Sequence, residues 1–179
     1  MKQTISYWQV GGFIFTSVLG TFLHFLFDLT GGSALAALVS AVNESIWEHM
    51  KLIFYPMVLV ALLEYRAWGR EDTRFWCVKF RGILLALALI PLIYYFYTGI
   101  LGVNTDWFNV TIFFIAAAAA YWTETKRFLS DRGCILGARY AIAGLCLIAA
   151  AFSVLTFFPI RIPFFKDPVT GTYGFLKEK

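Results

Sequence analysis

Both histidines of the chain lie close to carboxylates within one short stretch of the sequence. His24 and Asp28 are four positions apart. Glu44 and Glu48 have the same spacing, and His49 follows directly. Residues four apart share one face of a helix, so each pair can point in the same direction. Imidazole and carboxylate groups together could bind a divalent cation, relay protons or hold the amine of an organic substrate.

Six residues of this region form the candidate ligand-binding site: His24, Asp28, Asn43, Glu44, Glu48 and His49. Four of these are the candidate ligands of a divalent metal ion: His24, Asp28, Glu44 and His49. The chain has no H-E-x-x-H, H-x-x-E-H or G-x-S-x-G motif. Adjacent side chains on a helix point about 100° apart, so Glu48 and His49 could share an ion only beside a helix break.

Simpler interpretations exist for the same residues. Glu48 could cap a helix and pair with Lys51, three positions later. Asp28 could be a turn residue at the membrane interface, and His24 could make a polar contact between helices. Because both histidines and three carboxylates fall within 26 residues, we favour a shared polar cavity.

The composition places these residues in a membrane protein. Of the 179 residues, 60% are hydrophobic and 15% are charged, with a mean hydropathy of +0.71. Soluble domains have about 25% charged and about 45–50% apolar residues. These values exclude a soluble enzyme, a disordered chain and an ordinary nucleic-acid-binding protein. The long apolar runs predict an all-α integral membrane helical bundle and not a β-barrel.

Apolar runs predict five full spans, at about 7–27, 45–67, 79–98, 107–122 and 135–158. The apolar run 33–42 is too short to span and predicts a half-helix or re-entrant segment. Ser45 and Glu48 have the spacing of a capping box. The chain is therefore expected to break near Asn43, before the second span.

The chain is expected to comprise a transmembrane helical domain, residues 1–160, and an ordered outer-face tail, residues 161–179. Pro159 and Pro163 would end the last helix. The segment 167–174 is rich in turn-forming residues, so the tail could form a plug or lid.

The basic residues predict the orientation. The connections after the second and fourth spans carry Arg66, Arg70, Arg74, Lys79 and Arg81, and Lys126, Arg127, Arg132 and Arg139. The connections 28–43 and 98–106 contain no Lys or Arg. Since basic loops stay in the cytoplasm, a multi-pass protein of the cell membrane is predicted, with its N-terminus cytoplasmic and its C-terminus extracytoplasmic. The candidate site would then face outward.

The cysteines and one further acidic residue are expected to have structural roles and no part in the candidate site. Cys77, Cys134 and Cys146 are widely separated and lack C-x-x-C spacing, which predicts apolar fillers and neither a zinc site nor a disulfide framework. Glu64 is expected to form an interfacial ion pair with nearby Arg66.

Two segments carry a resemblance to a known group of proteins. Residues 43–51, Asn-Glu-Ser-Ile-Trp-Glu-His-Met-Lys, and the tail 167–174, Asp-Pro-Val-Thr-Gly-Thr-Tyr-Gly, resemble a family of small, uncharacterised bacterial polytopic membrane proteins. The resemblance implies a plasma-membrane protein of five or six helices, and it brings no activity with it. In size and hydrophobicity alone, the chain also looks like the substrate-binding subunits of energy-coupling-factor vitamin transporters.

Three functions are compatible with these features. The favoured one is a binding or transport protein with an outward-facing polar pocket for a cation or small polar molecule, in contact with the lipid bilayer and not with nucleic acid. The first alternative is a metal-dependent membrane hydrolase or transferase that acts on a lipid-like substrate at the outer leaflet. The second is a structural subunit of a membrane complex.

Overall fold

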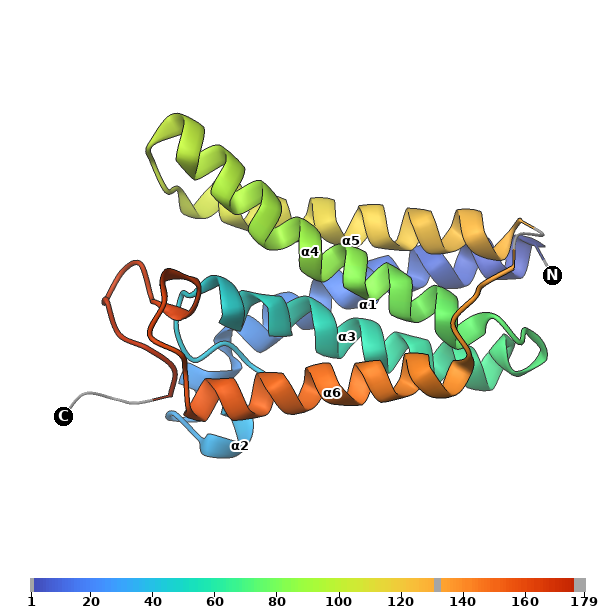
Figure 1. Ribbon diagram of the computed structural model, residues 1–179, viewed down its shortest axis with the longest axis horizontal. Coiled ribbons are helices and arrows are strands. Elements are labelled where there is room, and N and C mark those ends of the chain that lie inside the picture. Colours follow the sequence, from blue (N-terminus) through green and yellow to red (C-terminus); the bar gives the residue numbers. More distant parts are fainter. Residues whose placement is uncertain (1, 131–132, 176–179) are drawn as a thin grey trace.

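The computed structural model describes residues 2–130 and 133–175. Five long helices run back and forth along one axis (Figure 1): α1 Lys2–Leu29, α3 Ile46–Ala67, α4 Phe75–Leu101, α5 Asp106–Phe128 and α6 Ala138–Phe157. Short helical turns lie between them and in the tail: α2 Ala34–Ala37, η1 Gly69–Glu71 and η2 Pro163–Phe165. The described ranges contain no β-strand, so the predicted all-α class is confirmed.

Four of the five long helices, α1, α3, α4 and α6, are long and apolar enough to cross a membrane. The helix α5 has 23 residues and packs along α1 and α4, but it is less apolar than the others. In the described part of the chain, four of the five predicted spans are therefore long and apolar enough to cross a membrane. The crossing of the membrane by α5 stays a prediction. Apolar side chains such as Val18, Leu92 and Leu147 are exposed on the bundle, as expected of a surface that faces lipid.

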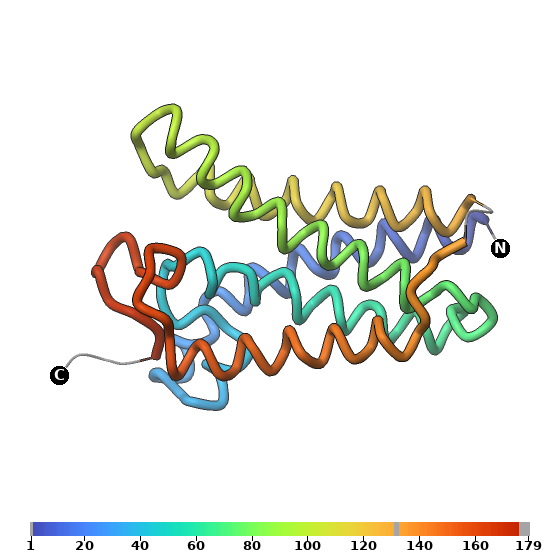
Figure 2. Tube along the Cα trace, in the orientation of Figure 1, coloured from blue at the N-terminus to red at the C-terminus, as the bar shows by residue number. Residues whose placement is uncertain are grey.

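The loops gather at the two ends of the bundle, as the tube in Figure 2 shows. The basic end holds the start of α1, the connection 68–74 and the described parts of the next connection, residues 129–130 and 133–137. The histidine end holds the connections 30–45 and 102–105 and the tail residues 158–175. The helix α3 lies at the centre, where Ile53, Phe54 and Met57 are fully or almost fully buried.

The break predicted near Asn43 is confirmed, and Ser45 explains where α3 begins. Ser45 is the N-cap residue, and its side chain accepts a hydrogen bond from the Glu48 N–H. The Ser45 N–H donates to Asn43 Oδ1 at 2.9 Å, so Glu48 does not complete the predicted capping box. The predicted half-helix is also shorter than expected, because α2 is a single turn of four residues.

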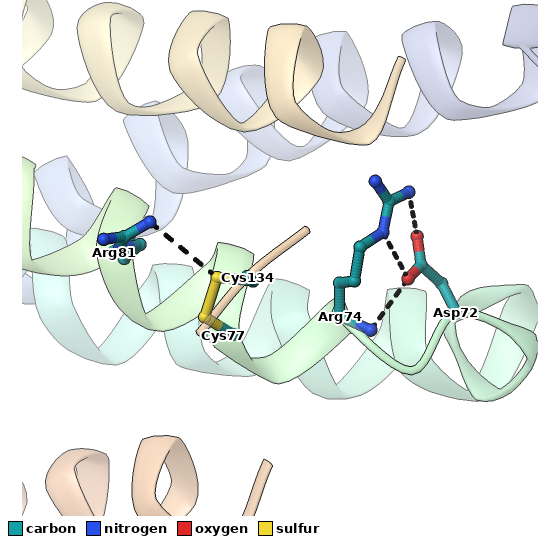
Figure 3. Close-up of a disulfide and its surroundings, with 5 residues drawn as sticks. All are labelled: Asp72, Arg74, Cys77, Arg81 and Cys134. Carbon is teal, nitrogen blue, oxygen red and sulfur yellow. Dashed lines mark hydrogen bonds and ion pairs between the residues drawn. A yellow bond between two sulfur atoms is a disulfide. The ribbon is translucent and has the colours of Figure 1, made fainter. Parts of the chain in front are cut away.

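A disulfide joins Cys77, in the first turn of α4, to Cys134, in the connection between α5 and α6 (Figure 3). Their Cα atoms are 6.2 Å apart. The prediction that these cysteines are apolar fillers was wrong, because the fold brings together residues separated by 57 positions. Cys146 is free and exposed. Beside the disulfide, Arg74 pairs with Asp72 and donates to the Ser130 carbonyl at 2.7 Å, which further ties the two basic connections together.

Candidate metal centre

Three of the predicted ligands meet at the histidine end of the bundle. His24 comes from the last two turns of α1, Glu44 from the connection before α3, and His49 from the first turn of α3. His24 Nε2 lies 3.8 Å from Glu44 Oε1, and His49 Nε2 lies 3.4 Å from Glu44 Oε2. One ligand atom from each residue lies within 4.8 Å of the other two. The Ser45 cap makes this convergence possible, because it leaves Glu44 outside the helix that carries His49.

The backbone orients the His49 ring. His49 Nδ1 lies 3.0 Å from the Ser45 carbonyl oxygen. Because a carbonyl can only accept, Nδ1 carries the hydrogen and Nε2 faces Glu44. Histidines that bind metal ions typically donate their other ring N–H to a carbonyl or carboxylate in this way, which fixes the tautomer and the ring. The imidazole of His24 lies beside it, with ring centroids 5.4 Å apart.

Glu44 supplies the negative charge of the cluster. Contact with the His49 imidazole lowers the pKa of the Glu44 carboxyl below the ordinary value of 4.5, and partial burial opposes this only in part. Its side chain keeps 48% exposure. An ionised, accessible carboxylate beside two imidazoles is a donor set suited to a divalent transition metal ion.

The cluster forms part of the wall of an open cleft with a volume of about 370 Å³, between α1 and α5. Asp106 and Asn109 of α5 add polar groups to this wall, and Val169 of the tail reaches it. Most of the remaining lining is apolar and includes Phe25, Val110, Phe113 and Phe114. The centre is therefore reachable from outside the bundle and has aromatic surroundings.

The other predicted ligands lie elsewhere. Asp28 is exposed at the end of α1 and is not one of the three clustered residues. Asn43 faces the tail, where its Nδ2 donates to the Gly174 carbonyl at 3.3 Å. Glu48 is buried on the inner side of α3 and pairs with Lys51. This separation of Glu48 from His49 follows from their adjacent positions on one regular helix.

A family model described as a family of unknown function (DUF6512) matches residues 1–175. The chain belongs to the DUF6512 family. No curated protein and no solved structure matches it significantly. The expected membership of an uncharacterised family is thereby confirmed over almost the whole chain, while the bacterial origin remains an expectation.

In this DUF6512 member, the buried pair Glu48–Lys51 links three segments. Lys51 Nζ donates to the Ala37 carbonyl at 2.8 Å and to Thr156 Oγ1 at 2.9 Å. Glu48 accepts from Thr156 Oγ1 at 2.8 Å and from the Val42 N–H at 3.1 Å. Both charges are thus matched and fully hydrogen-bonded in the interior, where an unmatched charge would be costly.

The tail packs against the same region. The Phe175 N–H donates to the Thr156 carbonyl at 2.8 Å. Asp167 is buried and accepts from the N–H groups of Val169 and Thr170, which closes the 167–172 turn. Thr156 therefore connects the tail, through its carbonyl, to the Glu48–Lys51 pair, through its hydroxyl.

A second buried charged group was missed by the sequence analysis. Glu64 of α3, Lys79 of α4 and Glu124 of α5 meet near the basic end, each with 0% exposure. The predicted pairing of Glu64 with Arg66 was wrong, since Glu64 turns inward to Lys79. Lys79 had been assigned to a basic loop, although it lies in the second turn of α4. The sequence does contain one indication of this group. Glu64 and Glu124 lie one turn inside long helices, where charged side chains within a membrane usually pair with a partner.

Proposed function

We propose that this DUF6512 protein binds a divalent transition metal ion in the cleft at the histidine end, through His24, Glu44 and His49. The observation that carries the proposal is the convergence of these three side chains on one accessible point. We further propose that all five long helices cross the cell membrane with the basic end in the cytoplasm, so that the ion is captured from the outer side.

The donor set favours zinc or a similar ion. Two imidazoles and a carboxylate are a known three-ligand set for zinc, with a fourth position left for water or substrate. Ligand bonds of about 2 Å place donor atoms roughly 3.5 Å from one another. The contact between His49 and Glu44 already has this length, and rotation of the half-buried His24 and the exposed Glu44 side chains would close the remaining gap.

Metal binding to the purified protein tests the proposal. Metal-free protein in detergent would be titrated with Zn²⁺ by calorimetry and with Co²⁺ by its visible absorption. We expect one ion per chain, and at least a tenfold weaker affinity for His24→Ala, His49→Ala and Glu44→Gln. The matched control is Asp28→Asn, which removes an exposed carboxylate one turn after His24 and should leave affinity unchanged. Equal binding by Glu44→Gln and the native protein would overturn the proposal.

A second candidate function is a metal-dependent hydrolase or transferase for a lipid-like substrate. It is favoured by the apolar mouth of the cleft, where Phe25 and Val110 are 54% and 57% exposed. These side chains could contact an acyl chain while the metal and its water face a headgroup ester. Release of water-soluble product from phospholipid vesicles, dependent on Zn²⁺ and lost in Glu44→Gln, would support this activity over binding alone.

A further inference from the structure

The buried group near the basic end has more negative than positive charge. Lys79 Nζ lies 2.6 Å from Glu64 Oε2 and 2.5 Å from Glu124 Oε2, so one ammonium serves two carboxylates. All three side chains are completely buried. With both carboxylates ionised, the group would hold a net charge of −1 away from water, which is strongly unfavourable.

Within residues 2–130 and 133–175, the ion pairs of this group join only Glu64, Lys79 and Glu124. The neighbouring side chains are neutral: Gln9 of α1 donates to Glu64 Oε1 at 2.9 Å, and Tyr121 of α5 lies under the Lys79 ammonium. The Tyr121 hydroxyl is engaged with Thr16 Oγ1 at 2.7 Å. Among the described residues, the charged members of this group are Glu64, Lys79 and Glu124.

The contacts of the four carboxylate oxygens distinguish the two residues. Glu64 accepts a hydrogen bond from Gln9 at Oε1, and its Oε2, although it has no hydrogen-bond partner, is in ion-pair contact with the Lys79 ammonium. Glu124 receives Lys79 at Oε2, whereas its Oε1 is buried and has no hydrogen-bond partner. A buried carboxylate oxygen without a donor is costly as an anion, and a proton bound to Glu124 removes the negative charge.

The space around this oxygen fits a proton better than a metal ion. Gly82 of α4 packs against Glu124, and a Cβ atom at position 82 would overlap Glu124 Oε1. The absence of a side chain at Gly82 is what lets the carboxylate fit against the helix. Gly82 therefore occupies the space on this side of Oε1, which leaves no room there for an ion with its ligand shell.

We propose that Glu64, Lys79 and Glu124 form a proton-binding centre, in which Glu124 holds one exchangeable proton. The centre lies at the opposite end of the bundle from the histidine cleft and is independent of metal binding there. Glu124 is four residues before the end of α5, and Glu64 is three before the end of α3. A proton would therefore exchange with the compartment at the basic end over a short distance.

Infrared spectroscopy of the full-length protein in lipid nanodiscs tests the proposal. The carbonyl stretch of protonated carboxyl groups would be recorded against pH, with deuterium exchange to identify exchangeable groups. We expect a band equivalent to a single carboxyl group at neutral pH, where exposed carboxyl groups are already ionised. The band should disappear in Glu124→Gln and also in Glu64→Gln, because either change leaves one carboxylate matched with Lys79.

The control is Glu71→Gln, an exposed carboxylate of η1 at the same end, which should keep the band. Absence of the band from the native protein at neutral pH would overturn the proposal, even if Glu124→Gln failed to fold. Persistence of the band in both Glu64→Gln and Glu124→Gln would overturn it as well.

Discussion

Glu48 and His49 are neighbours in the sequence, but their side chains leave α3 in different directions and belong to different groups. Glu48 has 1% exposure and binds Lys51, Thr156 and the backbone of Val42. His49 faces the cleft and contacts Glu44. The first turn of α3 therefore holds the connection 38–45 on its inner side and presents a candidate ligand on its outer side.

Replacing Glu48 is expected to affect folding more than metal binding. Glu48→Gln removes one partner of a buried ion pair and leaves Lys51 uncompensated, which typically costs about 3–5 kcal/mol. Thermal unfolding in detergent would measure the loss. The double change Glu48→Gln with Lys51→Met should cost less than the sum of the single changes, since the two residues act as a unit. Additive losses would show that the pair is not coupled.

The pH dependence of the metal centre follows from its donors. Free imidazole takes up a proton near pH 6.5, so affinity for Zn²⁺ should fall as the pH is lowered from about 7 to about 5. The lowered pKa of Glu44 keeps its carboxylate ionised over this interval. Calorimetric titrations at several pH values would measure the change. An affinity that is independent of pH would argue against histidine ligands.

The same carboxyl group predicts a separate effect on stability at lower pH. Because the pKa of Glu44 is lower in the folded protein than its ordinary value of 4.5, the folded state binds its proton less readily than the unfolded state. Its stabilising contribution is therefore present above about pH 4.5 and is lost as the pH falls through the folded pKa. The difference in unfolding temperature between native protein and Glu44→Gln should shrink below about pH 4.5.

The helices could be predicted from the sequence because their signals are local. Long apolar runs identify α1, α4 and α6, and the Ser45 cap identifies the start of α3. Of the predicted site residues, His24, Glu44 and His49 lie close together while Glu48 turns inward, and their role as a site stays a prediction. Which face of α3 lies inside the bundle depends on its packing, chiefly against α1 and α4. No periodicity within α3 reveals that choice, because its apolar residues surround it almost completely.

The buried contacts between distant residues could not be predicted for a related reason. Lys79 and Glu124 are 45 positions apart, and Cys77 and Cys134 are 57 apart. Each pair forms only when α4 and α5 pack side by side and the chain returns toward α6. A single sequence predicts where helices form, but it does not predict which helices pack together. Lys79 was therefore grouped with the basic residues of a loop.

The orientation of the bundle can be decided by cysteine labelling in whole cells. We expect Val103→Cys, at the histidine end, to react with a membrane-impermeant thiol reagent, and Thr73→Cys, at the basic end, to remain unlabelled. Val103 and Thr73 are exposed and uncharged, so neither change alters the charge of a loop. Position 103 is preferred to Gly102, whose φ of +66° would strain a cysteine.

The native cysteines provide an independent test of the same orientation. The basic residues favour a cytoplasmic basic end, where thiols are kept reduced. We therefore expect Cys77 and Cys134 to be free thiols in acid-quenched cells and to form their disulfide on oxidation after extraction. A disulfide already present in growing cells, together with labelling at position 73 and not at 103, would place the basic end outside and reverse the orientation.

The last prediction concerns the tail and the cleft beside it. Gly174 has a φ of +59°, and a Cβ atom there would overlap the Thr156 carbonyl oxygen and the Pro159 ring. Gly174→Ala should therefore lift the tail from Thr156 and weaken the Asn43–Gly174 contact. Since Val169 lies in the wall of the cleft, the change should alter Zn²⁺ affinity while membrane insertion stays normal.

The matched control for this variant is Gly11→Ala, the same chemical change at a helical position with open space around it. Alanine favours a helix by about 0.5–1 kcal/mol over glycine, so Gly11→Ala should fold at least as well as the native protein. Limited proteolysis would report release of the tail, and calorimetry would report Zn²⁺ affinity. If Gly174→Ala exposed the tail to protease but left affinity equal to that of Gly11→Ala, the tail would not act as a lid on the cleft. Because Thr156 also holds the Glu48–Lys51 pair, a loss of affinity without tail release would instead place the effect at that pair.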